Sequence, residues 1–170
     1  SATINQRIDL IEITKKFTHV EYNPKQFPGL VFRIKDPKTA ILIFSSGKMV
    51  CTGGKSEKMA KIAIKSVVSS LKENKIEVKK RAIVTVQNIV ASVDLGGKID
   101  LEEAARQLSN SMYEPEQFPG LIYRMKEPKS VILIFSTGKL VCTGTKIESQ
   151  VKNAVNNLHN LLEKKNLMLY

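Results

Sequence analysis

The feature that most limits how this chain folds is an internal duplication. Residues 26–53 read QFPGLVFRIKDPKTAILIFSSGKMVCTG, and 91 positions later residues 117–144 read QFPGLIYRMKEPKSVILIFSTGKLVCTG. Between residues 22–55 and 113–146, about 23 of 34 positions are identical without a gap. Self-similarity at a fixed offset indicates two copies of one structural unit. We therefore expect two repeats, residues 1–76 and 77–170, that together form one domain, with a charged linker at residues 72–81.

Each copy carries the same order of helix and strand signals. A short helix is predicted to begin at Asp9 and at Asp100, because a glutamate follows three residues later, the spacing of a capping box. Three strands separated by Pro-Lys and Gly-Lys turns come next. A longer amphipathic helix closes each copy, with apolar residues every three to four positions, namely Met59, Ile62, Ala63, Val67 and Leu71, then Val151, Ala154, Val155, Leu158 and Leu162. Clustered strands with two helices per copy predict an α+β fold, an antiparallel sheet covered on one face.

The predicted strands are apolar on both faces. In residues 40–44, AILIF, Ile41 and Ile43 point to one face, whereas Leu42 and Phe44 point to the other. The next strand alternates in the same way, with Met49 and Cys51 on one face and Val50 and Thr52 on the other. Helices can cover only one of these faces. The other is left as an exposed apolar surface, which usually marks a binding site.

Charge narrows the kind of partner that this face can bind. Lys+Arg 27 against Asp+Glu 16 gives a net charge of +11, which favours anionic partners such as nucleic acid or a membrane surface. Two alternatives to nucleic-acid binding remain open. One is a lysine-rich face that only contacts solvent, and the other is a homodimer of the free protein that covers the exposed apolar face. The minor groove of DNA offers both apolar sugars and dense phosphate charge, so it matches the predicted surface better.

Cysteine and histidine content argues against several other kinds of site. Cys51 and Cys142 occupy equivalent positions without a CxxC motif or nearby histidines, so we expect buried, reduced thiols in a cytosolic protein rather than metal ligands. The chain also lacks a Gly-rich phosphate loop and a Ser/Cys–His set, so we expect no enzymatic activity, metal or cofactor. No apolar run approaches the roughly 18 residues of a membrane span, and we expect no membrane association and no secretory signal.

The repeated motifs, together with VQNIVASVDLG at residues 86–96, resemble the TATA-box-binding protein family over nearly the whole chain. FPG in both copies is more typical of archaeal than of eukaryotic members. The resemblance implies a pseudo-symmetric saddle, one curved antiparallel sheet across both repeats with helices on the convex face and DNA under the concave face.

The resemblance also implies a function. The implied function is that of a general transcription initiation factor. Such a factor binds the TATA box as a monomer and recruits the B-type initiation factor and, through it, RNA polymerase. The implied location is the cytoplasm, at the archaeal nucleoid, or the nucleus if the chain is eukaryotic. An architectural paralogue that binds A·T-rich DNA with weak sequence preference is the alternative.

The resemblance assigns DNA-binding roles to individual residues. The wedge positions, for which this family is known, correspond to Phe27, Phe44, Phe118 and Phe135. The floor against base edges and sugars corresponds to Leu42, Val50, Thr52, Val90, Leu133, Val141 and Thr143. Asn88 matches a central asparagine whose amide can donate to the acceptors of A·T pairs. Phosphate contacts at the rim are assigned to Arg33, Lys48, Lys55, Arg124, Lys139 and Lys146. Phe17 and Phe32 lack such a match and are predicted to be core.

The loops that precede the two FPG motifs differ in charge. Asn23 and Lys25 of the first loop become Glu114 and Glu116 in the second. In the resembled family the second loop docks the B-type factor, which is basic. The resemblance therefore implies that Tyr113, Glu114 and Glu116 bind this partner.

The chain departs from the family at its start. Residues 1–4 align with residues 92–95, so the residues that match QNIVA at 87–91 would precede Ser1. We therefore expect the first repeat to lack most of its first strand, and with it the partner of Asn88.

Overall fold

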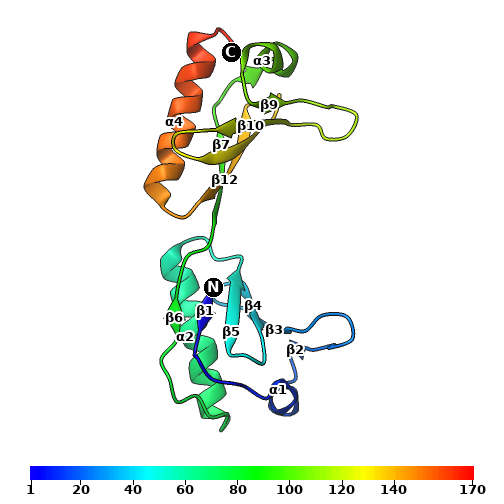
Figure 1. The fold of residues 1–170 in the computed structure, drawn as a ribbon, viewed down its shortest axis with the longest axis vertical. Coiled ribbons are helices and arrows are strands. Elements are labelled where there is room, and N and C mark those ends of the chain that lie inside the picture. Colours follow the sequence, from blue (N-terminus) through cyan, green and yellow to red (C-terminus); the bar gives the residue numbers. More distant parts are fainter. The chain divides into compact units, whose positions relative to one another are not determined.

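The computed structural model describes residues 1–170, which separate into two compact units, residues 1–86 and 87–170. The first unit contains, in order, β1 (Ala2–Thr3), α1 (Leu10–Lys16), β2 (Val20–Glu21), β3 (Leu30–Ile34), β4 (Thr39–Ile43), β5 (Lys48–Thr52), α2 (Glu57–Glu73) and β6 (Ile83–Val84) (Figure 1). The second contains β7 (Ile89–Asp94), β8 (Lys98–Ile99), α3 (Leu101–Gln107), β9 (Ser111–Met112), β10 (Leu121–Met125), β11 (Ser130–Ile134), β12 (Lys139–Thr145), α4 (Glu148–Lys164) and β13 (Met168–Leu169).

Each unit is built on an antiparallel sheet. The strand order is β2-β3-β4-β5-β1-β6 in the first unit and β7-β12-β11-β10-β9 in the second, where β13 and β8 form a separate pair. Ala2 lies opposite Met49 in the first sheet, and their counterparts in the repeat, Val93 and Leu140, lie opposite each other in the second. The strand pairing therefore agrees with the alignment of residues 1–4 with residues 92–95. The predicted α+β class is confirmed.

Both short helices begin where the sequence predicts. The Asp9 carboxylate accepts hydrogen bonds from the backbone N–H groups of Ile11 at 2.9 Å and Glu12 at 3.2 Å. In the second unit, Asp100 accepts from the N–H of Glu103 at 3.0 Å. An N-cap aspartate satisfies N–H groups that lack a partner within the helix, and typically stabilises a helix by about 1 kcal/mol.

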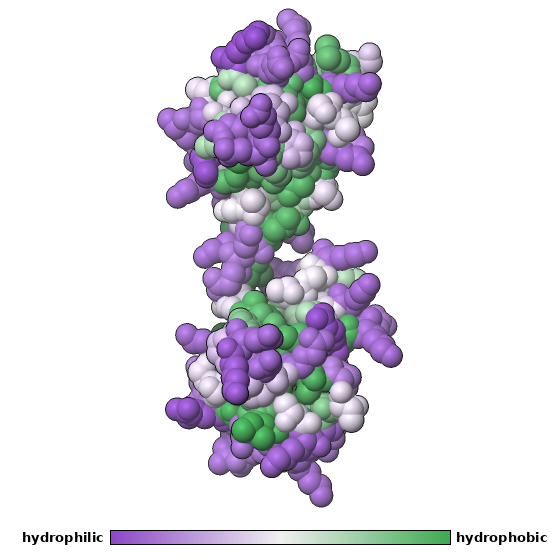
Figure 2. Space-filling view, turned by 90° about the vertical axis from the view of Figure 1, so that its right-hand side faces the viewer, coloured by the Kyte–Doolittle hydropathy of each residue, from purple (hydrophilic) through white to green (hydrophobic).

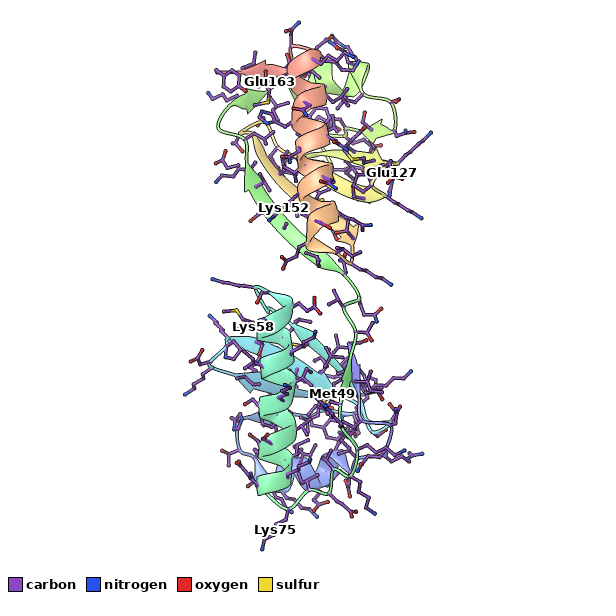
Figure 3. All side chains as sticks on the ribbon, turned by 90° about the vertical axis from the view of Figure 1, so that its left-hand side faces the viewer. Met49, Lys58, Lys75, Glu127, Lys152 and Glu163 are labelled. Atoms are coloured by element: carbon purple, nitrogen blue, oxygen red, sulfur yellow. The ribbon has the colours of Figure 1, made fainter.

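The long helices each lie across one face of the sheet of their own unit (Figure 3). All five apolar residues predicted to face the core from α4 are buried, as are Ala63, Val67 and Leu71 of α2. Met59 and Ile62 were predicted to join them, but they are 40% and 46% exposed. At 100° per residue both lie on one flank of α2, whereas the sheet contacts the opposite flank and buries Ile64 and Val68.

None of the four helices is both long and apolar enough to cross a membrane.

Strand side chains alternate between the core and the opposite face as predicted. Ile41, Ile43 and Met49 are fully buried in the first unit. Phe17 and Phe32, predicted to be core, are 9% and 4% exposed, and their ring centroids are 5.1 Å apart. The core of each unit thus lies between its sheet and its helices.

The stretch expected to be a linker, residues 72–81, starts inside α2 and continues along the first unit. Lys75 adopts a φ of 61°, which reverses the chain so that the Ile76 N–H donates to the Leu71 carbonyl at 2.9 Å. Ile76 and Val78 are 4% and 7% exposed and belong to the first core. Part of this charged stretch therefore stabilises the first unit.

We expect the two cysteines to be protected from thiol reagents in the folded protein. Cys142 is fully buried, Cys51 is half-buried against the first core, and both are free. Burial raises the pKa of both thiols, so less of the reactive thiolate is present at a given pH. Residue-resolved alkylation should be slow in the native state, slowest at Cys142, and fast in denaturant. Native labelling of Cys142 at the denatured rate would contradict this packing.

Candidate nucleic-acid interface

Each sheet has an open face, the face turned away from α2 or α4, and apolar side chains gather there among hydrophilic ones (Figure 2). The predicted floor residues all lie on these faces, because they alternate with core residues along the strands. Val50 and Val90 are 36% and 67% exposed. The others are exposed or half-buried, namely Leu42, Thr52, Leu133, Val141 and Thr143.

Strand register joins these residues into a strip on each open face. Leu42 lies opposite Val50 in the first unit, and Leu133 lies opposite Val141 in the second. Side chains directly opposite each other in antiparallel strands are in contact range, with Cβ atoms about 5 Å apart. The two copies therefore present the same apolar strip.

The phenylalanines predicted as wedges come together in two pairs. The ring centroids of Phe27 and Phe44 are 5.8 Å apart with an interplanar angle of 67°, and those of Phe118 and Phe135 are 5.9 Å apart at 66°. Both pairs have the edge-to-face geometry that aromatic rings favour. Phe27 is 41% exposed, and the other three are half-buried.

A glycine of the FPG motif lies against each phenylalanine pair. A Cβ atom added to Gly29 would sit 2.6 Å from the Phe27 ring and 3.1 Å from the Phe44 ring. At Gly120 the corresponding distances are 2.7 Å to Phe118 and 3.1 Å to Phe135. Neither glycine has a positive φ, so the close approach of the rings, rather than the turn, requires glycine here.

The loop that leads to each pair is closed in the same way in both units. The Phe27 N–H donates to the Asn23 carbonyl at 2.9 Å, and the Phe118 N–H donates to the Glu114 carbonyl at 2.9 Å. Glu114 and Glu116 are exposed on the second loop, and Tyr113 packs partly buried against the second core.

Asn88 is fixed in place by the neighbouring strand β12. Its Nδ2 donates to Thr143 Oγ1 at 2.9 Å, and its Oδ1 accepts from the Gly144 N–H at 3.0 Å. The β7–β12 register shifts between Cys142 and Thr145, which exposes the Gly144 N–H to this contact. One N–H of the amide group is left for a ligand. The sequence did not indicate this support, because it depends on an irregularity in strand pairing.

The six cations predicted at the rim are all exposed, but one of them is paired. Arg33 Nε lies 3.3 Å from Glu21 Oε1, whereas Lys48, Lys55, Arg124, Lys139 and Lys146 form no ion pair. Glu21 was not among the predicted site residues. It reaches Arg33 because β2 pairs with β3 so that Glu21 lies opposite Val31, two residues from Arg33.

The structure contains no cluster of three or more His, Cys, Asp or Glu that could hold a metal ion.

Comparison with known proteins gives consistent matches over most of the chain. The family described as "Transcription factor TFIID (or TATA-binding protein, TBP)" matches residues 1–74 and 83–165. The TATA-box-binding protein of Pyrodictium occultum is 52% identical over 164 residues, 96% of this chain and 82% of that protein. That of Methanobrevibacter smithii is 47% identical over 168 residues, 99% of this chain and 93% of that protein.

A solved structure shows the same likeness in three dimensions. Methanococcus jannaschii TBP superimposes with a TM-score of 0.87 at 45% sequence identity. The match covers 96% of this chain and 93% of that one. The fold class is therefore shared with this protein.

We predict that Gly120→Ala displaces the Phe118 ring. The added Cβ would be too close to that ring, and an off-rotamer side chain costs about 0.5–1.5 kcal/mol. The free energy of unfolding in denaturant should fall by a similar amount, and the aromatic NMR signals of Phe118 and Phe135 should shift.

Gly54→Ala is the matched control for this variant. An added Cβ there lies 3.4 Å from the Ala60 side chain, an ordinary contact, and its φ is not positive, so stability should be unchanged or slightly higher. Unchanged aromatic signals in Gly120→Ala would show that the glycine does not position the rings.

Proposed function

Because this chain belongs to the TATA-binding protein family, we propose that it is a general transcription initiation factor that binds the minor groove of TATA-box DNA through both open faces. Family membership makes it a DNA-binding transcription factor rather than an enzyme. The observation that carries the proposal is the open apolar face of each unit with its phenylalanine pair. Exposed lysine and arginine side chains on both units add the charge that phosphates require.

The chemistry of the open faces favours A·T pairs. In the minor groove, A·T pairs present only acceptors, whereas a G·C pair adds the guanine N2 amino donor. Against Val50 or Val141 this donor would be buried without an acceptor, which costs about 1–3 kcal/mol. The remaining N–H of Asn88 can donate to an acceptor of an A·T pair.

We propose that the phenylalanine pairs act as wedges at two base steps, the mechanism for which this family is known. Unstacking a base step costs free energy, and the larger contact area of bent DNA offsets this cost. The rings are already partly exposed and held against Gly29 and Gly120, so insertion requires little rearrangement of the protein.

The double variant Phe118→Ala, Phe135→Ala should lose the bend at one end of the site. Burying one phenylalanine side chain contributes about 1.5–3 kcal/mol, so affinity for TATA duplex should also fall more than tenfold. Energy transfer between dyes at the two DNA ends measures the bend, and a titration at fixed salt measures the affinity.

The double variant Met59→Ala, Ile62→Ala is the matched control for the wedge variant. It removes two exposed apolar side chains from α2, on the side of the first unit away from the open face. Bending and affinity should stay at the wild-type level. Normal bending by the phenylalanine variant would contradict the wedge mechanism.

We further propose that Tyr113, Glu114 and Glu116 dock the basic B-type initiation factor, which in turn recruits RNA polymerase. Both carboxylates are exposed and form no ion pair within the chain. The counterpart loop carries Asn23 and Lys25 instead, so a basic partner can distinguish the two units. Complementary charge of this kind mainly sets specificity and association rate.

Reversal of both charges, Glu114→Lys with Glu116→Lys, should abolish the supershift by the B-type factor and leave binding to TATA DNA alone intact. The reciprocal variant, Asn23→Glu with Lys25→Glu, makes the first loop acidic while the second stays unchanged. It should keep the normal supershift. A normal supershift with the reversed second loop would exclude this loop as the docking site.

A further inference from the structure

The two units differ in the residue beside one equivalent arginine. In the first unit, Glu21 on the edge strand β2 lies opposite Val31, and its carboxylate is 3.3 Å from Arg33 Nε. In the second unit, Met112 on the edge strand β9 lies opposite Ile122. Arg124, the counterpart of Arg33, forms no ion pair.

A groove of about 480 Å³ lies at this edge of the second unit. Met112 and Ile122 supply apolar lining, and Arg124, Lys126 and Lys129 supply three positive charges. Ile122 and Arg124 belong to the open face, because they alternate along β10 with the buried Leu121 and Met125. Met125, on the other side of β10, also lines the groove, so the groove runs around the edge of the sheet and combines apolar surface with cations where it reaches the open face.

The family resemblance already assigns phosphate contacts to both arginines, and we propose that Glu21 weakens this contact at Arg33 relative to the one at Arg124. Sugar faces match the apolar lining, and a phosphate matches the free guanidinium of Arg124. The two pseudo-symmetric units then hold DNA with unequal strength. This inference rests on the proposed DNA-binding function.

The Glu21 charge acts on a phosphate whether or not its ion pair with Arg33 persists. The two side chains are 66% and 61% exposed, and exposed ion pairs contribute only about 0–1 kcal/mol, so Arg33 can leave Glu21. The carboxylate nevertheless stays beside the arginine, well within the Debye length of about 8 Å at physiological salt. It therefore repels any phosphate that Arg33 contacts.

The neighbouring charges at this edge are otherwise the same in both units. Lys35 and Lys38 correspond to Lys126 and Lys129, and the acidic residue between each pair is also retained, as Asp36 and Glu127. The loops that follow these edge strands differ in charge in the other direction. The loop after β9 carries Glu114 and Glu116, whereas the loop after β2 carries Asn23 and Lys25. A comparison of whole units would mix the two effects, so the test uses single-residue variants within one unit.

The test measures how affinity for TATA duplex depends on salt. Each phosphate contact contributes about −0.9 to the slope of log affinity against log salt. Glu21→Met should steepen the slope by about 0.9 and tighten binding at low salt, whereas Met112→Glu should make the slope shallower by about 0.9. Glu21→Gln keeps the side-chain size and removes the charge, so it should steepen the slope as Glu21→Met does.

Glu57→Met is the matched control for Glu21→Met. Glu57 also forms an exposed ion pair, with Lys61 Nζ at 2.8 Å, so this variant frees one cation and raises the net charge by the same amount. It lies on α2, away from the open face, and should leave the slope at the wild-type value.

The outcomes separate this inference from the proposed function. A slope that changes equally in Glu57→Met and Glu21→Met would reflect net charge alone and overturn the inference. Slopes unchanged in both Glu21→Met and Met112→Glu would also overturn it while leaving DNA binding intact. Wild-type protein that does not prefer TATA duplex over a G·C-rich duplex would instead refute the proposed function.

Discussion

The structure depends on strands that carry apolar side chains on both faces. Because successive residues point in opposite directions, Ile41 and Ile43 enter the core while Leu42 and Val50 are left on the open face. A single long helix per unit covers only one side of its sheet. The pleat that stabilises the core therefore also creates the exposed apolar surface, and one strand sequence encodes fold and proposed function together.

Several groups on the open faces are held in place before any ligand binds. Gly29 and Gly120 let the phenylalanine rings lie close to the backbone, and Thr143 and the Gly144 N–H fix the Asn88 amide. Ordering a free side chain on binding costs about 0.5–1.5 kcal/mol. Side chains that folding has already ordered avoid most of this cost, which suits the DNA-binding role that we propose for these faces.

Duplication and divergence have different consequences here. Identical strand registers give both units the same apolar strip and the same ring geometry. A fully symmetric surface would bind DNA equally well in either orientation. In the function that we propose, a preferred orientation therefore has to come from positions where the two copies differ. Such positions lie at the edge strand, as Glu21 and Met112, and on the loop that follows it. These sites are exposed, where substitution leaves the core packing unchanged.

The sequence alone determined the features that depend on local periodicity. The repeat, the aspartate caps, the alternation within strands and the family resemblance were all visible in it, because each is a pattern of neighbouring residues. Tertiary structure decided which flank of α2 meets the sheet, leaving Met59 and Ile62 exposed, and it brought Ile76 into the first core. It also placed Glu21 beside Arg33. These outcomes depend on strand register and helix docking, which bring together residues that are distant along the chain.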